Sequence, residues 1–134
     1  MGRAARILVV DDNETLRTLV AQVLEAEGYV AIAADSAETA LDVAGFAPPD
    51  LFLIDHVMPG MSGADLIRAL RTSSDERLHD IPAIGLSAYD RGRYDLVVAG
   101  ALCAVGKPVA YAALLEAVRG ALGEGRSGER RAPA

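Results

Sequence analysis

The chain has 134 residues, of which 51% are hydrophobic, enough to bury the core of a single domain. Its formal net charge is −6 at pH 7, and residues 1–122 carry ten basic and seventeen acidic side chains. This acidic balance argues against direct binding of nucleic acid, which requires a basic surface. The single cysteine, Cys103, rules out an internal disulfide and suits a reducing compartment.

No N-terminal stretch has the apolar length of a signal peptide, because the apolar segment Ile7–Val10 runs directly into two aspartates. No apolar run reaches the length of a membrane span either. We therefore expect a cytoplasmic protein without a membrane partner.

Five short apolar segments have the length and composition of β-strands and end at polar or turn residues. The third of them places four apolar residues before Asp55, a pattern typical of a strand that is buried on both faces. The expected strands are Ile7–Val10, Val30–Ala34, Leu51–Asp55, Ile84–Ser87 and Ala101–Val105.

The segments between and after these strands repeat apolar residues at helical spacing, which predicts five helices. Asn13 can cap the first helix, and Gly28 is a natural stop at its end. Ser36 can cap a weaker second helix, which we expect Gly45 and the prolines that follow to break.

The third helix is expected to end near Arg71, before a polar loop over residues 72–80, and the fourth to span about Arg91–Ala99. A final helix places its apolar residues on one face, at Leu114, Leu115, Val118 and Leu122. We expect residues 1–122 to form one domain. The segment 123–134, rich in Gly, Arg and Glu, is expected to be a disordered tail.

Strands that alternate with helices predict an α/β fold with a parallel sheet covered on both faces. Right-handed crossovers and helices on both faces favour a doubly wound, flavodoxin-like sheet in the order 2-1-3-4-5. Strands one and three are neighbours in that order. Their carboxyl ends would bring Asp11, Asp12 and Asp55 into one crevice, where open α/β sheets bind their ligands.

Three carboxylates in one crevice repel one another. At an effective dielectric near 20, a pair ~4 Å apart costs roughly 4 kcal/mol, so a proton, a basic side chain or a metal ion must offset the charge. Oxygen ligands favour Mg²⁺, Mn²⁺ or Ca²⁺ over Zn²⁺. The alternative is that Asp55 is a turn aspartate and that Asp11 and Asp12 are exposed before a helix N-terminus, where negative charge is favourable.

Two further polar residues are expected at the same edge of the sheet. Lys107, the only lysine beside twelve arginines, follows the fifth strand, and its compact ammonium group can neutralise a phosphoryl group. Ser87 ends the fourth strand, where its hydroxyl can donate to a phosphoryl oxygen or satisfy a turn.

These residues together resemble the receiver domain of the response regulators of two-component signalling. The resemblance covers roughly residues 6–122. It rests on their order and spacing: Asp11-Asp12, Asp55 with Met58-Pro59-Gly60-Met61-Ser62-Gly63, Ser87-Ala88 and Lys107-Pro108.

By this resemblance, Asp55 accepts a phosphoryl group from a sensor histidine kinase or a phosphotransfer protein. The cofactor would be Mg²⁺, held by Asp11, Asp12, Asp55 and the backbone carbonyl of Val57. A carboxylate that attacks phosphorus forms an acyl phosphate, and Mg²⁺ supplies charge neutralisation.

The resemblance also implies that Ser87 is the switch hydroxyl, that Lys107 contacts the phosphoryl group and that Pro108 follows a cis peptide bond. Such a protein signals to a downstream protein target through a conformational change. It is not a turnover enzyme, because it catalyses only its own phosphorylation and dephosphorylation.

The sequence departs from the family pattern at two places. The family usually has an aromatic residue three positions before the lysine, where this chain has Ala104, and the segment Ser87–Lys107 is about two residues shorter than usual. Because a methyl group buries too little area to move a switch, we expect the response to phosphorylation in residues 88–99. His56, after the acceptor, is expected to be a surface or loop residue.

Other interpretations stay open. The chain can be a receiver from a hybrid histidine kinase, or an atypical receiver that works mainly as a protein-interaction module. A Mg²⁺-dependent aspartyl phosphatase would need a second acid two positions after Asp55, where this chain has Val57. A nucleotide or flavin binder would need a glycine-rich loop after the first strand, which is absent.

Overall fold

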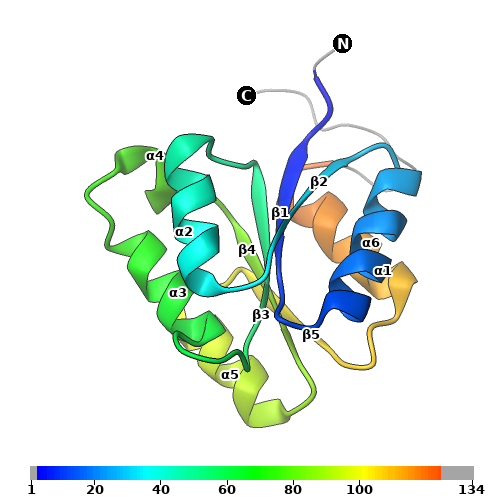
Figure 1. Ribbon diagram of the computed structural model, residues 1–134. Coiled ribbons are helices and arrows are strands. Elements are labelled where there is room, and N and C mark those ends of the chain that lie inside the picture. Colours follow the sequence, from blue (N-terminus) through cyan, green and yellow to red (C-terminus); the bar gives the residue numbers. More distant parts are fainter. Residues whose placement is uncertain (1–2, 125–134) are drawn as a thin grey trace.

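The computed structural model describes residues 3–124, which form one five-stranded parallel sheet in the order β2-β1-β3-β4-β5 (Figure 1). The predicted fold class and strand order are therefore confirmed. The strands are β1 (Arg6–Val10), β2 (Val30–Ala34), β3 (Leu51–Asp55), β4 (Ala83–Ser87) and β5 (Cys103–Gly106).

Helices cover both faces of this sheet. Figure 1 shows α1 and α6 on one face and α2, α3 and α5 on the other. The helix bounds are α1 (Glu14–Ala26), α2 (Ala37–Phe46), α3 (Gly63–Arg71), α4 (Glu76–His79), α5 (Asp90–Ala99) and α6 (Tyr111–Ala121).

The prediction of five helices was one short, because the expected polar loop 72–80 contains α4. This helix has only four residues, too few to show an apolar period, although the Asp75 carboxylate accepts a bond from the Arg77 amide at its start. The α2 prediction was also wrong at its end, since the helix continues through Gly45 to Phe46. The predicted caps Asn13 and Ser36 are confirmed, because both side chains accept a bond from a first-turn amide.

The alternation of strand side chains builds two cores. Leu8, Phe52 and Ile54 pack with residues of α2, α3 and α5, whereas Leu51 and Leu53 pack with residues of α1 and α6. Because β3 is buried on both faces, its four apolar residues contribute to both cores. Its last residue, Asp55, lies at the edge of the sheet and is also buried. The core thus holds the position of Asp55.

The last strand begins two residues later than predicted. Gly100 ends α5 with a positive φ of 123°, and Ala101 and Leu102 lie in the turn that follows. The amide of Leu102 donates to the carbonyl of Ala83, so this turn already lies along β4. Cys103 packs as a small hydrophobic residue against the core under α1 and α6.

The first two residues of the expected tail lie against the domain. The Glu124 amide donates to the carbonyl of Arg119 at 2.8 Å, and the Tyr29 hydroxyl donates to the Glu124 carboxylate at 2.8 Å. Burial and this hydrogen bond raise the pKa of Tyr29 to about 12. The rest of the expected tail, 125–134, lies outside the described residues. Over the part that is described, no helix is long and apolar enough to cross a membrane.

Candidate functional site

The predicted polar residues meet at the edge of the sheet where the parallel strands end. Asp11 directly follows β1, Asp55 ends β3, Ser87 ends β4 and Lys107 directly follows β5. A pocket opens among them, and its lining consists of Asp11, Asp12, Asp55, Val57, Ser87, Ala88, Tyr89 and Lys107. All six residues predicted from the sequence therefore line one pocket.

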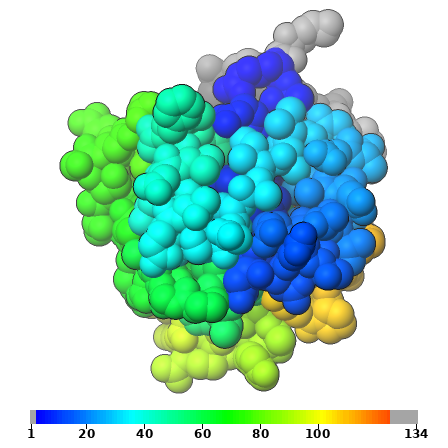
Figure 2. All heavy atoms as spheres, in the orientation of Figure 1, coloured from blue at the N-terminus to red at the C-terminus, as the bar shows by residue number. Residues whose placement is uncertain are grey.

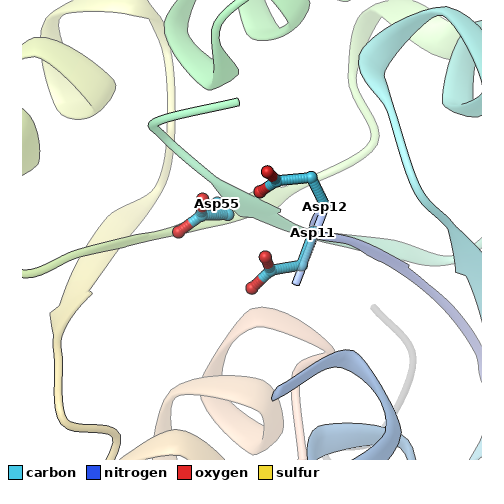
Figure 3. Close-up of side chains that lie close together, drawn as sticks. All are labelled: Asp11, Asp12 and Asp55. Carbon is cyan, nitrogen blue, oxygen red and sulfur yellow. The ribbon is translucent and has the colours of Figure 1, made fainter. Parts of the chain in front are cut away.

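The three carboxylates extend to the same side of the ends of β1 and β3 (Figure 3). One oxygen atom from each of Asp11, Asp12 and Asp55 lies within 4.8 Å of the others. Asp11 is 1% exposed and Asp55 is 4% exposed, whereas Asp12 is exposed. The alternative that Asp11 is an exposed turn residue is therefore wrong.

Backbone bonds fix Asp11. Its amide donates to the carbonyl of Ala34 at 3.1 Å, and its carbonyl accepts a bond from the Arg17 guanidinium at 2.8 Å. Its Oδ1 accepts the Asn13 amide at 2.9 Å, while Oδ2 is buried without a hydrogen-bond partner among the described residues. Burial raises the pKa of Asp11, although the Asn13 amide and Lys107 oppose that shift.

Lys107 lies between the two buried carboxylates. Its Nζ forms an ion pair with Oδ1 of Asp55 and lies 3.8 Å from Oδ2 of Asp11. Burial raises the pKa of Asp55, the bond from Lys107 lowers it, and the charge of Asp11 raises it again, with a net rise. The Lys107 amide donates to the Ser87 carbonyl at 3.1 Å, and the predicted cis bond before Pro108 is confirmed.

The switch candidate Ser87 is 3% exposed and does not bond to Asp55. Its hydroxyl donates to the carbonyl of Tyr89 at 3.3 Å and accepts the Tyr89 amide at 3.2 Å. Tyr89 is 70% exposed and lines the pocket mouth beside the exposed Val57. The Ser87 hydroxyl is thus bonded to the backbone at the start of the next helix.

The loop after β3 folds back tightly onto the strand end. The His56 amide donates to the carbonyl of Leu86 at 3.0 Å, and the His56 carbonyl accepts a bond from the Gly63 amide at 2.8 Å. A Cβ atom at Gly63 would lie 2.9 Å from the Cα of His56, so the close approach requires glycine. This loop places Val57 at the pocket, and its role as a carbonyl ligand stays a prediction.

Sequence reasoning missed the contacts that α5 makes with this site. The Arg93 guanidinium donates to the Ser87 carbonyl at 3.2 Å and pairs with Asp90. The His56 residue lies in the loop after β3, as expected, but its ring is mostly buried and its Nε2 lies 3.8 Å from the Asp95 carboxylate. The i,i+3 spacing of Asp90 and Arg93 could have suggested their pair. The contacts with Ser87 and His56 follow no sequence pattern, because they depend on how α5 packs against β4 and β5.

The site fits a hard divalent cation. Its donor atoms are carboxylate oxygens, and Oδ2 of Asp11 is a buried acceptor that no described protein group satisfies. Oxygen donors of this kind suit Mg²⁺, which binds through one or two carboxylates plus water and phosphate oxygens. The residues present therefore fit the ion that the sequence resemblance implies.

Comparisons with known proteins agree with this geometry. The family described as response regulator receiver domain matches residues 7–119. The polar-differentiation response regulator DivK of Brucella ovis is 32% identical over 120 residues, which cover 88% of this chain and 96% of DivK.

Two solved structures share the fold. The chemotaxis protein CheY4 of Vibrio cholerae has a TM-score of 0.81 and 26% identity, with 89% of this chain and 99% of that chain covered. The signal receiver domain of a histidine kinase from Syntrophus aciditrophicus has a TM-score of 0.82 and 28% identity, with 98% and 99% covered. The chain therefore belongs to the family of response regulator receiver domains.

Proposed function

We propose that Asp55 is the phosphoacceptor of this receiver. The observation that supports it best is the ion pair between the buried Asp55 carboxylate and Lys107, inside a pocket that also contains Asp11 and Asp12. Asp55 is the last residue of a fully buried strand, which fixes its backbone, and its buried side chain lines the pocket. This arrangement presents one positioned nucleophile to a phosphodonor.

An Asp55 oxygen attacks phosphorus, a new P–O bond forms, and the bond between phosphorus and the donor breaks. With a phosphohistidine donor, the electron pair of the broken P–N bond returns to the imidazole, which takes up a proton. The carboxylate charge is lost, and Lys107 then faces the negative phosphoryl oxygens. Hydrolysis of the acyl phosphate restores Asp55.

Asp11, Asp12, Asp55 and the carbonyl of Val57 would hold Mg²⁺. When bound, the ion neutralises charge on the transferring phosphoryl group. Asp11 offers Oδ2, which accepts no hydrogen bond and lies 3.8 Å from Lys107. The Asn13 amide and the backbone of Ala34 already fix the position of Asp11. Such a site needs little rearrangement to accept the cation.

A sensor histidine kinase or a phosphotransfer protein is the proposed donor, and a protein rather than nucleic acid is the proposed target. The domain catalyses only its own phosphorylation and dephosphorylation. A cytoplasmic location suits the single unpaired cysteine, Cys103. A receiver that belongs to a hybrid kinase is a second candidate, favoured by the likeness to the Syntrophus kinase receiver over 98% of this chain. Phosphotransfer assays against purified kinases and phosphotransfer proteins distinguish the two.

Mass spectrometry with a small phosphodonor such as acetyl phosphate tests the proposal. We expect one phosphoryl group per chain with Mg²⁺, and none after chelation or in Asp55→Asn. An unmodified chain that releases phosphate continuously would point to a phosphatase instead. An unmodified chain that releases no phosphate would point to an atypical receiver that acts only through protein contacts.

A further inference from the structure

Two of the candidate cation ligands share one peptide bond. Because the peptide unit is planar, the carbonyl of Asp11 and the amide of Asp12 turn together. The Asp11 carbonyl accepts a bond from Nη1 of Arg17 at 2.8 Å, and the Asp11 amide donates to the carbonyl of Ala34 at 3.1 Å. Asp11 is therefore held on one side by β2 and on the other by α1.

The Asp11 carbonyl depends on Arg17 for its donor. Asp11 is 1% exposed, and within residues 3–124 the Arg17 guanidinium is the only group that donates to this carbonyl. A buried carbonyl that loses its donor must turn to find another one. Such a turn would also move the amide of Asp12, and with it the direction in which the Asp12 side chain leaves the backbone.

The side chain of Asp12 has no partner of its own in the described part of the chain. It is exposed there and forms no hydrogen bond or ion pair. The carboxylate of Asp11, in contrast, is fixed by the Asn13 amide at 2.9 Å. The direction of the Asp12 carboxylate toward a shared cation therefore depends on the peptide that Arg17 holds.

The place of Arg17 in the fold suits this role. Its amide donates to the Asn13 carbonyl at 2.9 Å, so the residue lies in the first turn of α1, and its side chain reaches back to the strand end. The side chain borders a second pocket, which Asp35 and Thr39 also line. This pocket lies between α1 and α2, whose blue and cyan spheres are side by side in Figure 2. Arg17 belongs to neither hydrophobic core, so its replacement spares their packing.

The charge of Arg17 alone would act in the opposite direction. Burial raises the pKa of Asp11, and the Arg17 charge is the smallest of the effects that lower it, so this charge is felt at the carboxylate. A positive charge beside a cation site repels the cation. Replacing Arg17 should therefore tighten cation binding if only its charge matters, and weaken binding if the peptide must be held.

We propose that Arg17 is a positioning residue for the cation site, because it holds the Asp11–Asp12 peptide so that both carboxylates face one cation. The inference rests on the proposed Mg²⁺ site and extends it to a residue that supplies no ligand. Groups that orient metal ligands change metal affinity by about 10–100-fold when they are removed. Since Arg17 holds a peptide and not a ligating side chain, we expect an effect near the lower end of that range.

Titration of the full chain with Mn²⁺ tests the proposal. Mn²⁺ suits the same oxygen ligands as Mg²⁺, and electron paramagnetic resonance measures the free ion. Arg17→Ala should raise the Kd roughly tenfold. Arg17→Lys keeps the charge and one donor, so its Kd should fall between those of Arg17→Ala and the wild type. The matched control is Arg68→Ala, which removes an exposed arginine from α3 and should change the Kd less than about twofold.

A double variant separates positioning from a general loss of stability. In the Asp12→Ala background the carboxylate that the peptide directs is gone, so adding Arg17→Ala should raise the Kd much less than in the wild type. An equal rise in both backgrounds, or a Kd of Arg17→Ala at or below that of the wild type, would overturn the proposal. If Arg17→Ala does not fold, the same comparison with Arg17→Lys decides, and a Kd equal to that of the wild type would then overturn it.

Failure of the proposed function gives a different result. A chain that shows these differences in Mn²⁺ binding but gains no phosphoryl group on Asp55 would refute the phosphoacceptor and leave the role of Arg17 intact. A wild-type chain that binds no Mn²⁺ would overturn the role of Arg17 together with the cation site.

Discussion

Replacing Asp55 by asparagine should stabilise the protein in the absence of divalent cations. Oxygens of the Asp11 and Asp55 carboxylates lie within 4.8 Å of each other, which corresponds to roughly 3.5 kcal/mol of repulsion at an effective dielectric near 20. Lys107 offsets part of this cost through its ion pair with Asp55. Asparagine removes the charge and keeps an oxygen for Lys107, so we expect a gain of about 1–2 kcal/mol in the free energy of unfolding.

The pH dependence gives this prediction its sign. A carboxyl whose pKa is raised in the folded state stabilises the fold fully below its unfolded pKa, here 3.8, and loses that contribution as the pH rises through the folded pKa. The advantage of Asp55→Asn should therefore be largest at neutral pH and vanish below about pH 4.

Urea unfolding with a chelator, followed across this pH range, measures the difference. Adding Mg²⁺ should stabilise the wild type more than the variant, by about 2.7 kcal/mol at a cation concentration a hundred times the wild-type Kd. The matched control is Asp42→Asn, an exposed carboxylate of α2, which should change stability little at any pH. A variant no more stable than the wild type at neutral pH without Mg²⁺ would refute the electrostatic reasoning.

Three further predictions concern two side chains at the site, Lys107 and Tyr89, and one at the opposite edge of the sheet, Arg71. Lys107→Ala should fold and still accept a phosphoryl group. Beryllofluoride, which mimics that group, should change amide hydrogen exchange in residues 88–99 much less in this variant than in the wild type. An equal change in both proteins would show that Lys107 takes no part in the conformational response. Tyr89→Ala should shorten the lifetime of the acyl phosphate, since Tyr89 lines the pocket mouth, and an unchanged lifetime measured by mass spectrometry would contradict this. Arg71→Ala should lower the free energy of unfolding, measured in urea, by about 2–3 kcal/mol, because it leaves the carbonyls of Gly100, His79 and Ile81 without their guanidinium donor. A decrease of less than about 0.5 kcal/mol would show that water replaces the guanidinium as the donor to these carbonyls.

The sheet and the site edge could be predicted because their determinants are local. Four apolar residues before Asp55 indicate a strand buried on both faces, and β3 is buried at every position. The strand order then follows from alternation and crossover handedness. Polar residues that end separate strands, such as Asp11 and Ser87, must meet at one edge of a parallel sheet, and they line the same pocket.

The features that escaped prediction depend on short elements or tertiary packing. The helix α4 has too few residues for an apolar period. Gly45 lies in the last turn of α2, because the cost of one glycine in a helix, about 1 kcal/mol, is too small to end it there. Ala101 and Leu102 have strand composition but follow a helix-ending glycine. Gly92 packs against Ser87 only because α5 lies across the strand ends, so a lone glycine in the sequence gave no indication of this contact.

The most direct test of the account is to locate the modified residue. After incubation with acetyl phosphate and Mg²⁺, borohydride reduces an acyl phosphate on aspartate to homoserine, and peptide mass spectrometry identifies its position. We predict homoserine at position 55 alone, dependent on Mg²⁺. Homoserine at position 11 or 12, or none at all in a chain that has gained a phosphoryl group, would contradict the assignment of Asp55 as the phosphoacceptor.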